Sequence, residues 1–183
     1  NIAVLAAAPG TVIAVRNDLP DHMPGHYDPE KIKGQECGNG VLIDHGNGWH
    51  TQYCHMRQGS IQVRESEQVY RRQLLGSIGL SGMTEFPHLH LSVRYLDEVV
   101  DPFLGVGAEA GCGVSGKPLW ESDALAGLAY RPTGILSSSF TDRVPTKNEI
   151  VSGQHRHDNL RPNAPNLVFW VMIYGLQTGD EEQ

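Results

Sequence analysis

The chain has 183 residues, of which 39% are apolar and 19% are charged, so it can bury a core and does not have the composition of a disordered tail. No apolar run approaches the ~20 residues that a membrane-spanning helix needs. The net charge is −7 and Lys and Arg form no block, which argues against nucleic acid or an anionic membrane as the main partner.

Short strand-like segments follow one another along the first part of the chain. They lie at residues 1–5, 12–15, 41–45, 49–56, 60–63, 74–79 and 88–95. Gly46, Asn47 and Gly48 predict a hairpin turn, because Gly and Asn adopt positive φ at low cost. Residues 16–40 are polar and contain three prolines, which indicates a long surface loop. Short, evenly spaced strands with almost no helical periodicity predict an all-β fold.

The composition shifts near Gly105, which indicates a boundary between two units. We expect a first domain over residues 1–110, a short helix within 121–129, and a second unit over residues 125–183. Strand-like text in that second unit lies at 134–137, 149–151 and 167–174. The run from Leu167 to Tyr174 is nearly all apolar, as in a strand buried on both faces, and predicts a partial immunoglobulin-like β-sandwich. With no catalytic cluster, this unit is expected to position the first domain or to bind a protein partner.

The three cysteines are Cys37, Cys54 and Cys112. Cys37 and Cys54 flank two expected strands, which suits a cross-strand disulfide, whereas three buried thiols are an equally good interpretation of the composition.

Two histidines lie two residues apart in the segment Pro87-His88-Leu89-His90. On a strand, residues i and i+2 point to the same face, so His88 and His90 are expected to present two imidazoles side by side. Neutral imidazole binds metals and carries protons near pH 7. Alternation along residues 49–56 places Tyr53 and His55 on one face and Cys54 on the other, with His55 near the expected histidine pair. His-x-His alone is a weak motif, and two surface histidines are the competing interpretation.

Several motifs in this order resemble the lysostaphin (LytM-type) zinc endopeptidases. They are Ala6-Ala7-Ala8-Pro9-Gly10-Thr11-Val12, the stretch 38–48, Thr51-x-Tyr53-x-His55, Leu75-Gly76-x-Ile78-Gly79-x-Ser81-Gly82, Pro87-His88-Leu89-His90 and Asp101-Pro102-Phe103. The resemblance covers residues 2–103 and implies a small antiparallel sheet that carries Zn²⁺ and cleaves peptides of peptidoglycan.

The resemblance also implies a role for each histidine. His90 is expected to be a zinc ligand, while His55 and His88 are expected to be catalytic, as proton carriers or transition-state donors beside the metal water. The family takes two further ligands from a His-x-x-x-Asp segment upstream of the Ala-Ala-Ala-Pro-Gly strand. Asn1 reads as the middle of a strand, so we expect that segment to precede it in the full-length protein; without it the fragment would be inactive.

Other candidate sites are weaker. Residues 111–118 imitate a phosphate-binding loop but have Pro118 where Ser or Thr is needed. His155 and His157 lie in a polar stretch that predicts a solvated loop, and His22 and His26 are separated by Pro24, so they are expected in a loop. His45, beside the hairpin turn, is expected to be structural.

The sequence therefore favours a zinc-dependent metalloendopeptidase that acts on peptidoglycan in the periplasm or outside the cell. The acidic balance favours a Gram-negative periplasm, and a Cys37–Cys54 disulfide would suit an oxidising compartment. The alternative is a catalytically inactive LytM-type domain that binds the cell wall or activates an amidase.

Overall fold

The structure is a computed structural model of the chain, and it describes residues 2–22, 28, 30, 32–107, 116–128, 131, 133–152, 160, 162–176 and 178–179. The all-β prediction is confirmed. The strands are β1 (Ala3–Leu5), β2 (Gly10–Arg16), β3 (Asn39–Gly46), β4 (Trp49–Met56), β5 (Gln68–Val69), β6 (Leu74–Ser77), β7 (His90–Tyr95), β8 (Glu98–Val100), β9 (Gly134–Thr141) and β10 (Val168–Tyr174). Two short helices complete the described elements, α1 (Ser122–Gly127) and α2 (Lys147–Ser152).

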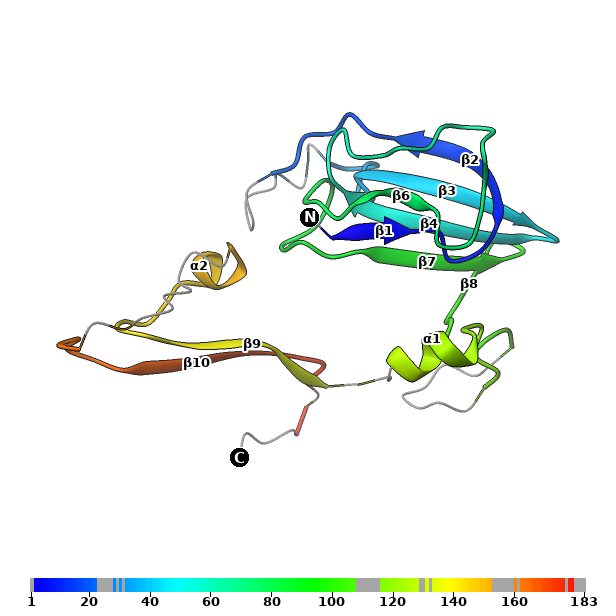
Figure 1. Cartoon of the computed structure of the whole chain (residues 1–183). Coiled ribbons are helices and arrows are strands. Elements are labelled where there is room, and N and C mark those ends of the chain that lie inside the picture. The colour runs from blue at the N-terminus through cyan, green and yellow to red at the C-terminus, as the bar shows by residue number, and fades with distance from the viewer. Residues whose placement is uncertain are drawn as a thin grey trace.

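A six-stranded antiparallel sheet with strand order β5-β2-β3-β4-β7-β8 forms the main layer of the fold (Figure 1). The predicted hairpin joins β3 to β4, and Gly46, Asn47 and Gly48 all have positive φ there. This turn sets the register of β4, which pairs with β7 from Trp49 opposite Tyr95 to Cys54 opposite His90. The ladder therefore brings residues 49–54 beside residues 90–95, and it ends next to His55 and His88.

The hydrophobic core lies between one face of this sheet and a second layer in which β1 pairs with β6 (Figure 1). The sheet and the second layer both contribute apolar side chains to it: Val4, Ala6, Val12, Val41, Ile43, Tyr53, Met56, Ile61, Val63, Val69 and Leu75. The expected strand at 60–63 is wrong, since these residues form no ladder. Ile61 and Val63 still point into the core, and Gln62 N donates one hydrogen bond to Leu75 O at 2.9 Å.

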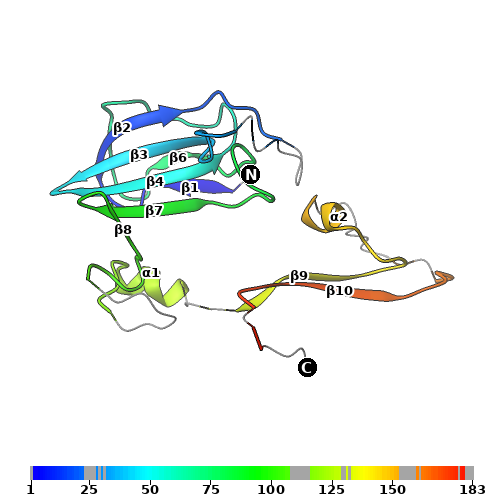
Figure 2. The same ribbon diagram turned by 180° about the vertical axis from the view of Figure 1, so that it is seen from behind.

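The opposite face of the sheet, which faces the viewer in Figure 2, carries mostly polar side chains and is called the open face below. Residues directly opposite each other in a ladder point to the same side, so the register defines its members. They are Thr11, Ala14 and Arg16 of β2, Gly40, Leu42 and Asp44 of β3, His50, Gln52 and Cys54 of β4, and His90, Ser92 and Arg94 of β7.

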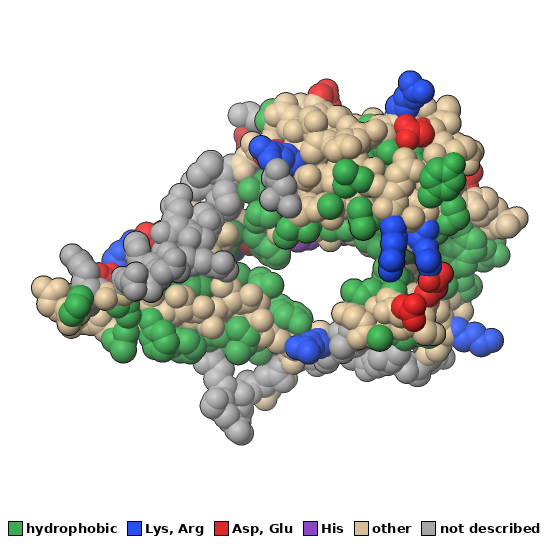
Figure 3. Space-filling view, in the orientation of Figure 1, with side chains coloured by type: hydrophobic (Ala, Val, Ile, Leu, Met, Phe, Trp, Pro, Cys, Tyr) green, Lys and Arg blue, Asp and Glu red, His purple; other side chains and the backbone are tan. Residues whose placement is uncertain are grey.

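In the second unit, β9 and β10 pair as a two-stranded antiparallel ribbon. The predicted strand 167–174 is confirmed, but its two faces are not both buried: Trp170 is buried, whereas Phe169 is 57% exposed. Hydrophobic side chains gather along this ribbon in Figure 3. The described residues of this second unit contain no other sheet for the ribbon to pack on, and the immunoglobulin-like sandwich stays a prediction.

The expected strand at 149–151 is wrong, because residues 147–152 form α2. A reciprocal cap explains this: Thr146 N donates to Glu149 Oε2 at 2.8 Å, and Glu149 N donates to Thr146 Oγ1 at 3.3 Å. This is the Thr-x-x-Glu capping box, a signal for the start of a helix that the sequence does contain. The short helix expected within 121–129 is confirmed as α1.

A disulfide joins Cys37 to Cys54, with the two Cα atoms 4.8 Å apart. This settles the choice between a disulfide and free thiols for that pair. Cys112, His26, His155 and His157 lie outside the described residues, as does most of the stretch 111–118. None of the described helices has the length and hydropathy needed to cross a membrane.

Candidate active site

His55 sits at the end of β4 in a left-handed backbone conformation, with φ of 60°. The ladder with β3 explains it: Tyr53 opposes Val41 and Met56 opposes Asn39, so β4 carries one extra residue there. Such a β-bulge re-aims side chains. The alternation expected from the sequence is therefore broken: Tyr53 and Met56 both enter the core, and His55 turns away from it toward the start of β7.

A buried hydrogen-bond network fixes the His55 ring. His55 Nδ1 lies 3.0 Å from Ser81 O, and since a carbonyl only accepts, Nδ1 carries the proton and Nε2 is left with the lone pair. Ser81 is itself held by its hydroxyl, which accepts from Asn39 N at 2.8 Å and donates to Met56 O at 2.7 Å. Asn39 and Ser81 are both fully buried. Both lie in motifs that carry the family resemblance, but the sequence assigned neither of them a role in shaping the site.

His88 lies in the loop before β7, so the expectation that it begins the strand is wrong. The β4–β7 ladder ends at the Cys54–His90 pair, because the bulge at His55 turns β4 away and leaves residue 88 without a strand partner. Its ring is held locally instead: His88 Nδ1 lies 2.9 Å from Phe86 O and 3.1 Å from Thr84 Oγ1. His88, like His55, therefore keeps Nε2 free of a proton when neutral.

His90 is the first residue of β7 and points to the open face, opposite Cys54. The Ser92 hydroxyl lies 3.3 Å from His90 Nε2, whereas no described residue makes a hydrogen bond to Nδ1. Nδ1 is therefore the ring nitrogen that is available to a ligand.

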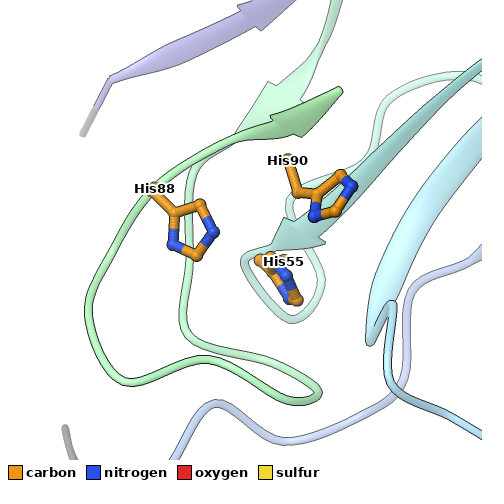
Figure 4. A group of neighbouring side chains, drawn as sticks. All are labelled: His55, His88 and His90. Carbon is orange, nitrogen blue, oxygen red and sulfur yellow. The ribbon is translucent and has the colours of Figure 1, made fainter. Parts of the chain in front are cut away.

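The three histidines converge although they come from a strand end, a loop and a strand start (Figure 4). One nitrogen from each of His55, His88 and His90 lies within 4.8 Å of the others, and the ring centroid of His55 is 4.9 Å from that of His88 and 5.9 Å from that of His90. Neutral imidazole is a common zinc ligand, and a catalytic zinc takes three protein ligands. His90 Nδ1 therefore fits the metal that the resemblance implies as one of these ligands, with His55 and His88 beside it.

Burial lowers the pKa of His55 below its ordinary value of 6.5. The hydrogen bond to Ser81 opposes this shift, while the positive charges that His88, His90 and His22 can carry add to it. His55 is 5% exposed, so desolvation of the imidazolium outweighs the stabilising contact with one carbonyl. The His55 ring is consequently a neutral base at pH 7.

Two loops close tightly around the base of the site. His55 N donates to Cys37 O at 2.8 Å, and Met83 N donates to Glu36 O at 2.8 Å. Gly82 has φ of 77°, and a Cβ there would lie 2.4 Å from Glu36 O, so only glycine permits this approach. The Cys37–Cys54 disulfide fastens the same loop to β4 directly before His55.

Two other described histidines, His45 and His22, serve the framework. His45 bridges Pro9 O and Thr51 Oγ1, each at 2.8 Å, in agreement with its expected structural role. His22 lies in a loop, as expected, and its Nε2 donates to Gly82 O at 2.8 Å.

Residues 1–102 match the profile of peptidase family M23, which is more than half of the chain. The chain belongs to peptidase family M23. This match confirms the resemblance to the lysostaphin and LytM-type enzymes. The matched residues include the sheet and the three histidines, which therefore form the peptidase part of this M23 chain.

Two curated relatives match this part of the chain. The cell division protein DipM of Caulobacter vibrioides is 31% identical over 98 residues, which are 54% of this chain and 13% of DipM. The peptidoglycan DD-endopeptidase ShyA of Vibrio cholerae is 42% identical over 54 residues, which are 30% of this chain and 12% of ShyA. The M23 chain thus spans about an eighth of the length of these relatives.

Among solved structures, a zinc-containing peptidase from Vibrio cholerae is similar, with 28% identity, a TM-score of 0.41, and coverage of 54% of this chain and 25% of that one. The antimicrobial peptidase lysostaphin from Staphylococcus simulans has 19% identity and a TM-score of 0.38, with coverage of 77% of this chain and 54% of that one.

Proposed function

We propose that this M23 chain is part of a zinc-dependent metalloendopeptidase that hydrolyses peptide bonds of peptidoglycan. One observation carries the proposal: three histidines meet within 4.8 Å at the edge of an open sheet face in a chain of this peptidase family. The substrate is inferred from the name of ShyA, a peptidoglycan DD-endopeptidase. The Cys37–Cys54 disulfide is typical of oxidising compartments and supports a periplasmic or secreted location.

The roles proposed for the histidines follow from their ring contacts. His90 would hold the metal through Nδ1, since Ser92 occupies its other nitrogen. A zinc ion there supplies a Lewis acid for the scissile carbonyl and for the attacking water. His55 and His88 each have Nδ1 held by a carbonyl, so each presents Nε2 to the site and can accept a proton from water or pass one to the leaving amine.

The test uses the full-length protein with purified peptidoglycan and measures peptide release by mass spectrometry and bound zinc by elemental analysis. Removing the metal with a chelator should abolish release, and added zinc should restore it. We expect His90→Ala to lose both metal and activity. His55→Ala and His88→Ala should keep zinc and lose about 10²–10⁴-fold in turnover, because they move protons and do not hold the ion.

Other results of these experiments would contradict specific parts of the proposal. Loss of zinc in His55→Ala or His88→Ala would make that residue a ligand and contradict the proposed division of roles. A full-length, zinc-loaded protein that binds peptidoglycan but releases no peptide would contradict the enzymatic function. His45→Ala is a control of matched size, since His45 lies outside the cluster, and it should keep bound zinc.

A further inference from the structure

The open face is polar and contains cationic side chains, although the whole chain is acidic. The chain has 14 Lys and Arg against 21 Asp and Glu. On the open face the register places Arg16 and Arg94, with Asp44 as the one carboxylate among its paired members. Asp44 accepts a hydrogen bond from Gly46 N at 2.7 Å and lies 3.9 Å from His50 Nε2, so it is engaged at the far end of the sheet.

The two arginines differ in their surroundings. Arg16 lines a hollow of about 400 Å³ to which the acidic residue Glu36 also contributes. Arg94 forms no ion pair with any described residue, and its one hydrogen bond there is from Nη1 to Gln52 Oε1 at 2.9 Å. A guanidinium has five N–H donors in a planar fork, so most of the donors of Arg94 remain available to a further acceptor.

Gln52 directs the Arg94 guanidinium along the sheet toward the histidines. In the β4–β7 ladder Gln52 lies opposite Ser92, and Ser92 lies between Arg94 and His90 on the same face of β7. Gln52 is itself oriented by a contact of its Nε2 with Cys37 Sγ at 3.5 Å. The guanidinium is thereby drawn toward the Ser92 position, two residues from His90.

The distance along the strand sets what this cation can reach. A strand rises about 3.3 Å per residue, so two residues separate the Gln52–Ser92 pair from His90 by about 7 Å. An extended peptide on the open face has the same rise per residue. A group that meets Arg94 therefore lies about two residues from the peptide bond placed at the histidines.

We propose that Arg94, oriented by Gln52, binds a carboxylate of the peptide substrate about two residues from the bond that is cleaved. This inference rests on the proposed peptidase function and adds a specificity-determining residue to it. A carboxylate is the acceptor that matches the fork of a guanidinium, and its charge complements the unpaired cation. The carboxylate can belong to an acidic side chain or to the end of the peptide.

The test measures peptide binding to the full-length, zinc-loaded protein by stopped-flow fluorescence anisotropy, before any turnover. Labelled alanine-based pentapeptides carry either Glu or Gln at one position, and each ends in either a carboxylate or a carboxamide. The wild type should bind the best-placed carboxylate about tenfold more tightly than its amide counterpart, and high salt should reduce the preference. The pair that shows the preference identifies the side chain or the terminus as its source.

The variants assign the preference to Arg94. Arg94→Gln should remove it, while Arg94→Lys should keep part of it, since charge remains without the fork. Arg64→Gln is the matched control, because Arg64 is exposed and lies outside the open face, and it should behave as the wild type. The inference is overturned if Arg94→Gln discriminates as the wild type does, or if the wild type binds acid and amide peptides equally or binds none. Discrimination by a protein that cleaves nothing would leave the inference standing and refute the proposed function.

Discussion

At the scale of single residues, the site depends on buried groups behind the histidines as well as on the histidines themselves. His55 adopts φ of 60°, which is uncommon for a residue with a side chain, and its ring is held by the carbonyl of Ser81. The Ser81 hydroxyl in turn connects the two strands that frame the bulge, through Asn39 N and Met56 O. A strained residue persists only where such neighbours fix it from several sides.

We expect Ser81→Ala to destabilise the protein by about 1–3 kcal/mol, because it leaves Asn39 N buried without its partner and leaves Met56 O with only the longer hydrogen bond from Asn39 Nδ2 at 3.3 Å. Urea denaturation followed by tryptophan fluorescence measures the change. Ser138→Ala removes the same hydroxyl from an exposed position of β9 and should shift stability by less than about 0.5 kcal/mol. Equal effects of the two variants would mean that the buried network contributes nothing.

The lowered pKa of His55 predicts how stability depends on pH in the metal-free protein. The folded state binds a proton less readily than the unfolded state, whose histidine has the ordinary value of 6.5. The contribution of the neutral ring is therefore fully present above pH 6.5 and is lost as the pH falls below it, because the unfolded chain gains the proton first. Proton NMR should give a midpoint for His55 below 6.5. A midpoint at or above 6.5 would show that the Ser81 hydrogen bond, and not burial, dominates.

At the scale of elements, the loop that ends at Cys37 and the strand β4 act as one piece. The disulfide closes a sequence separation of 17 residues, and the same loop receives the backbone N–H of His55. Gln52 of β4 also reaches Cys37 Sγ, so the disulfide borders both the histidine cluster and the Arg94 position.

We expect the double variant Cys37→Ser, Cys54→Ser to be about 3 kcal/mol less stable than the wild type, since the cross-link restricts the unfolded chain. Denaturant titrations with and without a reducing agent measure this. Reduction should lower the midpoint of the wild type to that of the variant and leave the variant unchanged. A wild-type midpoint that does not respond to complete reduction would contradict the expectation.

At the scale of the whole molecule, the core that supports the site lies within the first unit. Every residue of the core cluster falls between Val4 and Leu75, with Leu89 and Leu91 packed against it. Residues 116–128 remain attached to that unit through Leu119 N, which donates to Pro102 O at 2.8 Å, and through the ring contact of Trp120 with Phe103. Beyond residue 128, Lys147 meets Glu85 in an exposed ion pair at 2.8 Å.

We therefore expect a chain that ends at Leu128 to keep the free energy of unfolding of its sheet domain to within about 0.5 kcal/mol. The exposed Lys147–Glu85 pair is lost by this truncation, and such pairs contribute little to stability. Circular dichroism during urea denaturation measures this free energy, with the 183-residue chain as reference. A large loss of stability would show that β9 and β10 belong to the same cooperative unit and would contradict the two-domain prediction.

The sequence by itself determined the all-β class, the hairpin at Gly46–Gly48 and the family, because alternation, turn residues and ordered motifs are local properties of the chain. It also selected His55, His88 and His90, since a His-x-His pair and a strand-end histidine stand out in the sequence. Only the tertiary structure decided how they meet. The bulge at His55 arises from the pairing of β4 with two neighbours, and the loss of strand pairing at His88 follows from that bulge. Ser81 holds the ring of His55 although the two residues are 26 positions apart, and Gln52 holds Arg94 although these two are 42 positions apart. No local sequence pattern encodes contacts at such separations.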